Sequence, residues 1–175
     1  LGASTYEAQT AVGVEIAHQT GAFLTRGDVT NAVNVPNIAP EKLRKLAPYM
    51  DLSKKLGRLL CRMGDAPFHL VEVGIFGEAA NLDPHPIASA AIVGLLCDHH
   101  SIPVNQVNSR YLARRQGIQV IETSSANSRD YVSLIRLTGS SDNGLLILEG
   151  AIFDERHPRL VRINDYAIES ALEGH

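Results

Sequence analysis

The residue pattern of this chain changes period about two-thirds of the way along. Up to Gly117 most apolar residues recur three or four positions apart, which is the spacing of helices that bury one face. Beyond that point short apolar stretches alternate with polar clusters rich in Ser, Asn and Gly, which is typical of strands joined by turns. Helices first and strands later predict the α+β class, with helices packed on a mostly antiparallel sheet and preceded by a long N-terminal helix.

The helical segments have recognisable start signals. Ser4 and Glu7 have the spacing of a capping box before the long N-terminal helix. Pro48 suits the first turn of the next helix, and Asp83-Pro84 suits the opening of a third. A short fourth helix has Arg110, Arg114 and Arg115 on a face that we expect to be exposed, with Asn108 as its N-cap. The expected helices span residues 5–26, 49–63, 83–98 and 107–116.

The strand signals fall mostly in the last third. Phe68–Phe76 is largely apolar on both faces, which favours a central position in the sheet. The later strands are separated by short polar turns, so we expect them to form an antiparallel meander. The expected strands span residues 68–76, 118–123, 131–138, 145–152, 159–163 and 166–169.

Composition narrows the class of protein. The 175 residues carry a formal net charge of −3, which argues against a cationic binder of nucleic acid or of membrane surfaces. The longest nearly apolar run, Ile87–Cys97, is too short to span a bilayer.

The two cysteines, Cys61 and Cys97, have neither the spacing of zinc ligands nor that of a redox motif. We therefore expect two buried, reduced thiols of a cytoplasmic protein. A disulfide or a catalytic thiol is the alternative.

Catalytic motifs do not emerge from the sequence. It contains no glycine-rich dinucleotide fingerprint, no phosphate-binding loop and no nucleophile elbow. The run Asp98-His99-His100 lacks the usual spacing of metal ligands, and we interpret it as a polar helix end rather than a metal site. We therefore expect no catalytic, cofactor-binding or metal-binding residues in this chain.

One set of residues could bind a small anion. Arg129 follows a loop of serines and an asparagine, and hydroxyl, amide and guanidinium groups together suit a carboxylate or a phosphate. The alternative is that these are solvated surface groups. The candidate effector-binding residues are Arg129, Ser128, Asn108, Lys54 and Arg162.

The N-terminal residues also carry a resemblance. Leu1–Gln9, which reads LGASTYEAQ, resembles the segment that follows the catalytic histidine in D-2-hydroxyacid dehydrogenases and continues into a long helix. Later segments are also similar to long members of that family. These segments are Asn31–Pro36, Leu52–Leu59, Val107–Ser109 and Val161–Asn164.

The resemblance implies a division of the chain and of the activity. Residues 1–36 would be the last helix of the catalytic region and a connector, and residues 37–175 an intervening domain, also called the allosteric substrate-binding domain. In the family, the catalytic residues and the NAD-binding loop precede this segment, and an ACT domain follows it. The resemblance therefore implies an NAD-dependent parent enzyme and a fragment that is not catalytic by itself.

The resemblance also implies partners. The intervening domain in relatives is implicated in binding a phosphorylated hydroxyacid or another anion and in transmitting serine inhibition from the ACT domain. Relatives can carry a Lys near the position of Glu122, where a glutamate would repel an anion. Homo-oligomers are the family norm. The alternative function is a structural or oligomerisation spacer that has no ligand of its own.

Overall fold

The computed structural model of the chain describes residues 5–26, 40–96, 103–128, 130–154 and 156–172, and it divides the chain into two compact units, Leu1–Ile38 and Ala39–His175. The first unit contains helix α1, Tyr6–Arg26, which confirms the predicted N-terminal helix. Thr5 caps it, because the Thr5 Oγ1 accepts a hydrogen bond from the Ala8 backbone N–H at 3.3 Å. Ser4 lies outside the described residues.

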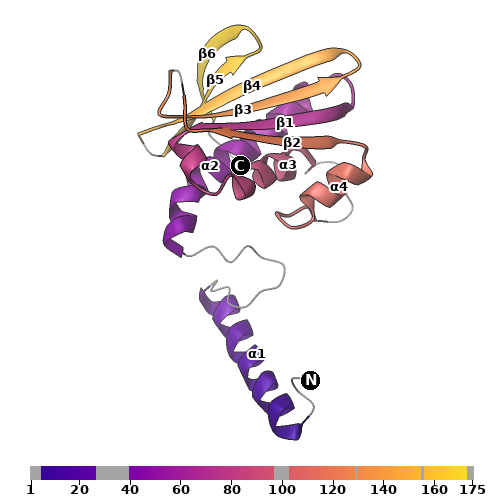
Figure 1. The fold of residues 1–175 in the computed structure, drawn as a ribbon, viewed down its shortest axis with the longest axis vertical. Coiled ribbons are helices and arrows are strands. Elements are labelled where there is room, and N and C mark those ends of the chain that lie inside the picture. The colour runs from indigo at the N-terminus through magenta and orange to yellow at the C-terminus, as the bar shows by residue number, and fades with distance from the viewer. Residues whose placement is uncertain (1–4, 27–39, 97–102, 129, 155, 173–175) are drawn as a thin grey trace. The chain divides into compact units, whose positions relative to one another are not determined.

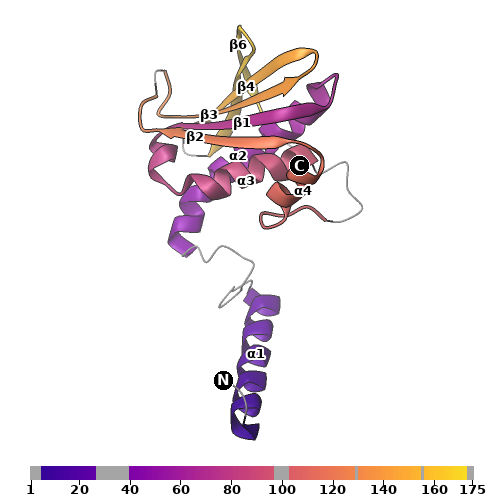
Figure 2. The ribbon, with the colours of Figure 1, turned by 45° about the vertical axis from the view of Figure 1, so that its right-hand side comes forward.

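The second unit has two layers, which confirms the α+β class. A six-stranded sheet carries helices α2 and α3 on one face, and the short helix α4 lies beside the β2 edge (Figures 1 and 2). The helical elements are α2 (Pro40–Met63), the 3-10 turn η1 (Glu78–Asn81), α3 (Pro84–Leu96) and α4 (Ser109–Arg115). The strands are β1 (Phe68–Gly77), β2 (Gln119–Ser125), β3 (Ser133–Ser141), β4 (Gly144–Phe153), β5 (His157–Ile163) and β6 (Tyr166–Ala171).

The strand order is β2-β1-β3-β4-β5-β6. Strands β3 to β6 form the predicted antiparallel meander, but β2 does not join it directly, because β1 lies between β2 and β3. β1 and β2 run parallel, with Leu70 opposite Gln119 and Phe76 opposite Ser125. A parallel pair needs a long crossover, supplied here by η1, α3 and α4. Local residue patterns do not specify such a pairing, so the prediction missed it.

Helix α2 begins at Pro40 and not at Tyr49, as the sequence predicted. Pro48 consequently lies inside the helix and not in its first turn. Pro40 suits the helix start, where a missing backbone N–H leaves nothing unpaired. Leu46 is fully buried in the added turns, and this packing outweighs the cost of an internal proline.

Helices α2 and α3 cross with their backbones nearly in contact. A Cβ added at Gly57 would lie 2.0 Å from the Ala91 carbonyl oxygen, and one added at Gly94 would lie 2.0 Å from that of Lys54. Only glycine permits this approach. The core around the crossing consists of fully buried leucines of α2 and the apolar residues of α3. It includes Leu52, Leu56, Leu60, Ile87, Ile92 and Leu96.

The remaining helices agree with the predictions within a few residues. Asp83 opens α3, because its Oδ1 accepts a hydrogen bond from the His85 backbone N–H at 3.2 Å. The last described residue of α3 is Leu96, so the predicted end at Asp98 lies outside the described residues. In the described part of the chain, no helix combines the length and the hydropathy that a membrane crossing requires.

Candidate functional site

The residues predicted to bind an anion lie on separate segments. Arg129 lies outside the described residues. Ser128 follows β2, and its Oγ is enclosed without a hydrogen bond to any described group. Lys54 is half-buried on α2. No hydrogen bond or ion pair joins any two of the described members of the set, so a shared ligand stays a prediction.

Asn108 occupies the N-cap position of α4, as predicted, but its side chain does not cap the helix. Its Oδ1 accepts a hydrogen bond from the Asn105 N–H at 2.8 Å, and its Nδ2 donates to the Pro103 carbonyl at 3.0 Å. The Asn108 side chain therefore fixes the turn before the helix.

Arg162 belongs to a cluster on the face of the sheet that the helices leave open. A Cβ at Gly150 would meet the Leu52 side chain of α2, so the neighbouring Glu149 points to the opposite face. The strand register aligns Arg136 of β3, Glu149 of β4 and Arg162 of β5 across this outer face.

Both arginines bind the same carboxylate. The Glu149 Oε1 accepts a hydrogen bond from Arg136 Nε at 2.6 Å, and its Oε2 accepts one from Arg162 Nε at 3.0 Å. Glu149 is only 4% exposed, and the Arg136 guanidinium also lies 5.4 Å from the centre of the Phe76 ring. A buried carboxylate needs such compensation, so we assign this cluster a structural role. The sequence prediction included Arg162 but missed its partner Glu149.

A second ionic cluster lies where β2 meets α3 and α4. Glu122 of β2 forms an ion pair with Arg110 of α4, and His85 Nδ1 lies 3.5 Å from the same carboxylate oxygen. Burial lowers the pKa of the Arg110 guanidinium from its ordinary value. The prediction that Arg110 is exposed is wrong. Its side chain is half-buried, because it forms the ion pair with Glu122 of the sheet. That pairing also offsets the anion repulsion expected from Glu122.

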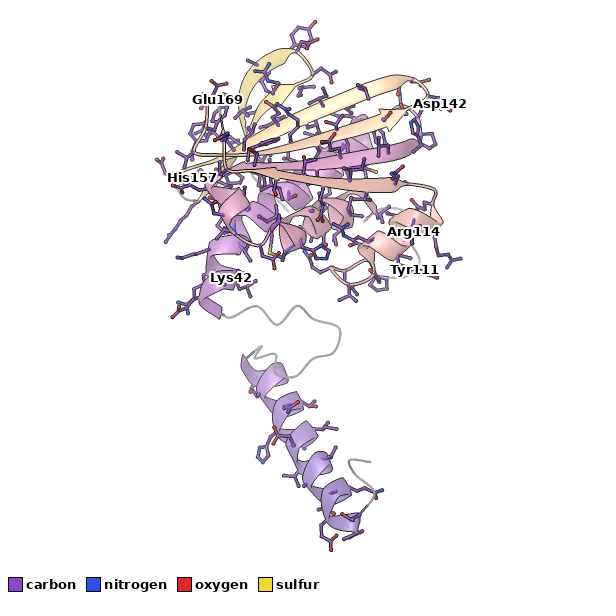
Figure 3. The ribbon with its side chains drawn as sticks, viewed as in Figure 1. Lys42, Tyr111, Arg114, Asp142, His157 and Glu169 are labelled. Atoms are coloured by element: carbon purple, nitrogen blue, oxygen red, sulfur yellow. The ribbon has the colours of Figure 1, made fainter. Side chains whose placement is uncertain are left out.

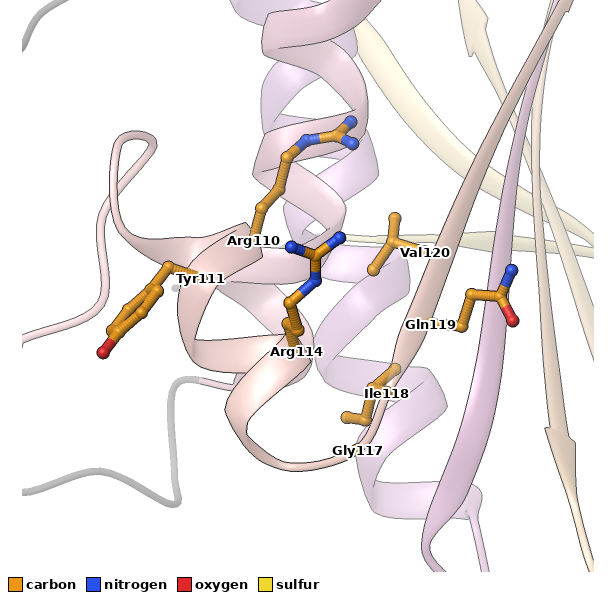
Figure 4. Close-up of a pocket in the computed structure, with 7 residues that line it drawn as sticks. All are labelled: Arg110, Tyr111, Arg114, Gly117, Ile118, Gln119 and Val120. Atoms are coloured by element: carbon orange, nitrogen blue, oxygen red, sulfur yellow. The ribbon is translucent and has the colours of Figure 1, made fainter.

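A pocket of about 640 Å³ lies next to this cluster, between α4 and the start of β2 (Figure 4). Arg110, Tyr111 and Arg114 line it from the helix, Gly117 and Ile118 from the connection after the helix, and Gln119 and Val120 from the strand. The Arg115 guanidinium lies 5.9 Å from the centre of the Tyr111 ring, outside the pocket lining. Arg114 forms no hydrogen bond or ion pair with any residue the structure describes, so its charge is available at the pocket.

The structure describes only some of the residues that could bind a metal or act as thiols. Among the residues that the structure describes, no three His, Cys, Asp or Glu side chains lie together as metal ligands would. Cys61 is half-buried near the end of α2. Cys97, His99 and His100 lie outside the described residues.

The comparisons with known proteins agree on one family. Residues 45–164 match the family model described as the D-3-phosphoglycerate dehydrogenase intervening domain. The match runs from within α2 to the turn after β5, so it includes the helical layer and the strands β1 to β5.

Individual relatives align along nearly the whole chain. The D-3-phosphoglycerate dehydrogenase of Methanocaldococcus jannaschii is 36% identical over 174 residues, which is 99% of this chain and 33% of that protein. The enzyme of the same name from Synechocystis sp. is 34% identical over 169 residues, 96% of this chain and 30% of that protein. The one from Bacillus subtilis is 27% identical over 175 residues, 100% of this chain and 33% of that protein. The chain therefore spans about a third of the length of the curated relatives it matches.

Proposed function

This chain belongs to the family of D-3-phosphoglycerate dehydrogenase intervening domains, and from that membership we propose that it is a regulatory, non-catalytic part of such an enzyme. The whole enzyme oxidises 3-phosphoglycerate to 3-phosphohydroxypyruvate with NAD, in the first step of L-serine biosynthesis in the cytoplasm. The observation that carries this proposal is the match over residues 45–164, supported by relatives that align along 96–100% of this chain.

The proposed role of the domain is to couple a bound anion to the catalytic and ACT domains of the same enzyme. A coupling of this kind requires that the ligand bind one arrangement of the domains more tightly than another. We propose a homo-oligomer in which the domain senses a small phosphorylated hydroxyacid or another anion. NAD binds to the catalytic part and not to this chain.

The proposed anion site is the loop that leads from β2 to β3. Ser128 supports this placement, because its enclosed hydroxyl lacks a hydrogen-bond partner in the described structure and could donate to an anion. Arg129 would supply the charge and the paired donors that a phosphate or carboxylate accepts. Lys54, Asn108 and Arg162 remain secondary candidates, with Arg162 already bound to Glu149.

A titration of the chain with 3-phosphoglycerate and with sulfate tests the site. We expect the melting temperature to rise in a saturable way, because a ligand that binds only the folded state stabilises it. Arg129→Ala should abolish the rise. Arg156→Ala is the matched control, because it removes an arginine from the β4–β5 turn and should leave the rise intact.

The second candidate function is a structural spacer without a ligand. Two observations favour it: the buried apolar core of the second unit, and the two arginines that balance the charge of the buried Glu149. Both stabilise the domain without a ligand. An unchanged melting temperature up to millimolar ligand would select the spacer. A rise that survives Arg129→Ala would keep a binding function but move its site elsewhere.

A further inference from the structure

β2 is an edge strand with one side unpaired. It pairs with β1 over its whole length, and no described strand lies on its other side (Figure 1). Alternate backbone N–H and C=O groups of residues 119–125 therefore point away from the sheet. Such a row of donors and acceptors can pair with another extended chain.

The two edges of the sheet differ in how well they are protected. At the β6 edge, the β5–β6 register shifts between Leu160 and Arg162, and an irregularity of this kind hinders the addition of a strand. The β1–β2 register is unbroken from Gln119 to Ser125, and β2 contains neither proline nor lysine. Its one charged residue, Glu122, is neutralised by Arg110. β2 therefore lacks three of the features that usually block edge pairing: a proline, a lysine and a break in the register.

The basic helix α4 lies beside this edge. Arg110 is engaged with Glu122, and Arg115 lies over the Tyr111 ring. Arg114 has no partner among the described residues and lines the pocket between α4 and the first residues of β2 (Figures 3 and 4). An unpaired guanidinium group thus stands next to the unpaired backbone of the edge strand.

We propose that the β2 edge binds an extended, acidic segment of a partner protein as an additional strand. The backbone of the segment pairs with the free side of β2, and one of its carboxylates binds to Arg114. Backbone pairing supplies affinity in this mode of recognition, and side-chain contacts supply specificity. A carboxylate is the group that the guanidinium fork of arginine binds best.

Charge complementarity favours this occupant over a second copy of the chain. If β2 paired with β2 of another copy, each strand would contribute only one carboxylate, that of Glu122. This carboxylate is already bound to Arg110. Arg114 would then stay unpaired in the dimer. A partner segment with its own free Asp or Glu satisfies both the edge and Arg114.

The test uses a fluorescein-labelled probe peptide of sequence Thr-Val-Glu-Val-Thr-Val and measures its binding to the chain by fluorescence anisotropy. We expect saturable binding that weakens by about tenfold or more when Arg114→Glu reverses the charge at the pocket. Arg115→Glu is the matched control, because it makes the same charge change on the same helix outside the pocket lining. It should weaken binding by less than about twofold, as expected of a screened surface charge.

Two modified peptides separate edge pairing from charge attraction. A peptide with Lys in place of Glu should lose binding to the wild-type chain and regain it with Arg114→Glu. A peptide N-methylated at every residue keeps its charge but has no backbone N–H left to donate along either edge, and it should not bind. NMR chemical-shift changes should concentrate on the amides of β2 and leave those of β6 unchanged.

Several outcomes would overturn the proposal. They are the absence of saturable binding, equal losses in the Arg114 and Arg115 variants, and binding of the N-methylated peptide as tight as that of the parent peptide. Concentration-dependent dimerisation of the chain that Arg114→Glu leaves unchanged, and that the peptide competes with, would assign the edge to a second copy instead.

Discussion

On the face of the sheet that α2 and α3 cover, contacts join apolar side chains, whereas on the outer face two arginines bind a buried glutamate. The covered face tolerates little added volume, because a Cβ at Gly150 would lie 2.7 Å from the Leu52 side chain of α2. Within the helical layer, Gly57 and Gly94 lie directly against carbonyl groups of the facing helix. The outer face depends on charge balance, since Glu149 has two partners that share its compensation. The comparison teaches that one sheet can be stabilised by shape on one side and by electrostatics on the other.

The largest effect is expected from Gly94→Leu. The new Cβ would lie 2.0 Å from the Lys54 carbonyl oxygen, and neither helix backbone can move away without opening the core. We expect a loss of about 4 kcal/mol or more in the free energy of unfolding, measured by urea denaturation with circular dichroism. Gly13→Ala is the control, because nothing lies within 4 Å of a Cβ there. If Gly94→Leu melted like the wild type, the close crossing would be wrong.

Leu56→Ala should come next. Leu56 is fully buried beneath the sheet, and removing three carbons leaves a cavity, so we expect a loss of about 2–5 kcal/mol. Leu145→Ala offers the matched control at a position that is 62% exposed, with an expected change below about 0.5 kcal/mol. Equal losses in the two variants would contradict the assignment of the core to the helical face.

The outer face should respond in a non-additive way. Arg136→Ala or Arg162→Ala alone leaves Glu149 with one partner, and we expect each to cost about 1 kcal/mol. Both together leave a buried carboxylate uncompensated, with an expected loss of about 3 kcal/mol, moderated because the arginines are 46% and 39% exposed. A double-mutant cycle measured by chemical denaturation gives the excess. Simple additivity would mean that solvent, and not the second arginine, compensates Glu149.

The smallest effect is expected at the Arg159–Glu169 pair. This ion pair joins β5 to β6 at 2.8 Å, but its side chains are 38% and 62% exposed. Figure 3 shows Glu169 among the side chains at the β6 side of the sheet. We expect Glu169→Ala to change the free energy of unfolding by less than about 0.5 kcal/mol, and high salt to remove even that difference. A loss above 1 kcal/mol would show that this part of the outer face is more enclosed than its exposure indicates.

The sequence predicted the bounds of most helices and strands better than it predicted which of these elements contact each other. The strands β1 and β4 agree with their predicted bounds within a residue, because apolar stretches and turn residues are local signals. The start of α2 was wrong, because Pro48 suggests a boundary that the burial of Leu46 overrides. The neighbours of β1 were not foreseen, because pairing across the crossover depends on how α3 packs.

The ionic clusters show the same limit. Arg136 and Glu149 lie at equal distances from the Asp142-Asn143 turn, so the β3–β4 hairpin alone would have placed them opposite each other. The prediction did not use this equal spacing, so it missed the Arg136–Glu149 pair. The Arg110–Glu122 pair has no such signal, because it joins a helix to a strand across the sheet edge. The predicted anion site depends on Arg129, and its assignment still requires the titration.

The parallel pairing of β1 with β2 also sets the order in which the sheet can assemble. Hairpins between β3, β4, β5 and β6 join residues near in sequence, so closing them costs little chain entropy. Leu70 can meet Gln119 only after the whole crossover has been brought together. Because folding rates fall as contacts become less local, we expect the meander to form early and the β1–β2 crossover to limit the rate of folding. The edge proposed to bind a partner is thus the last part of the sheet to be completed.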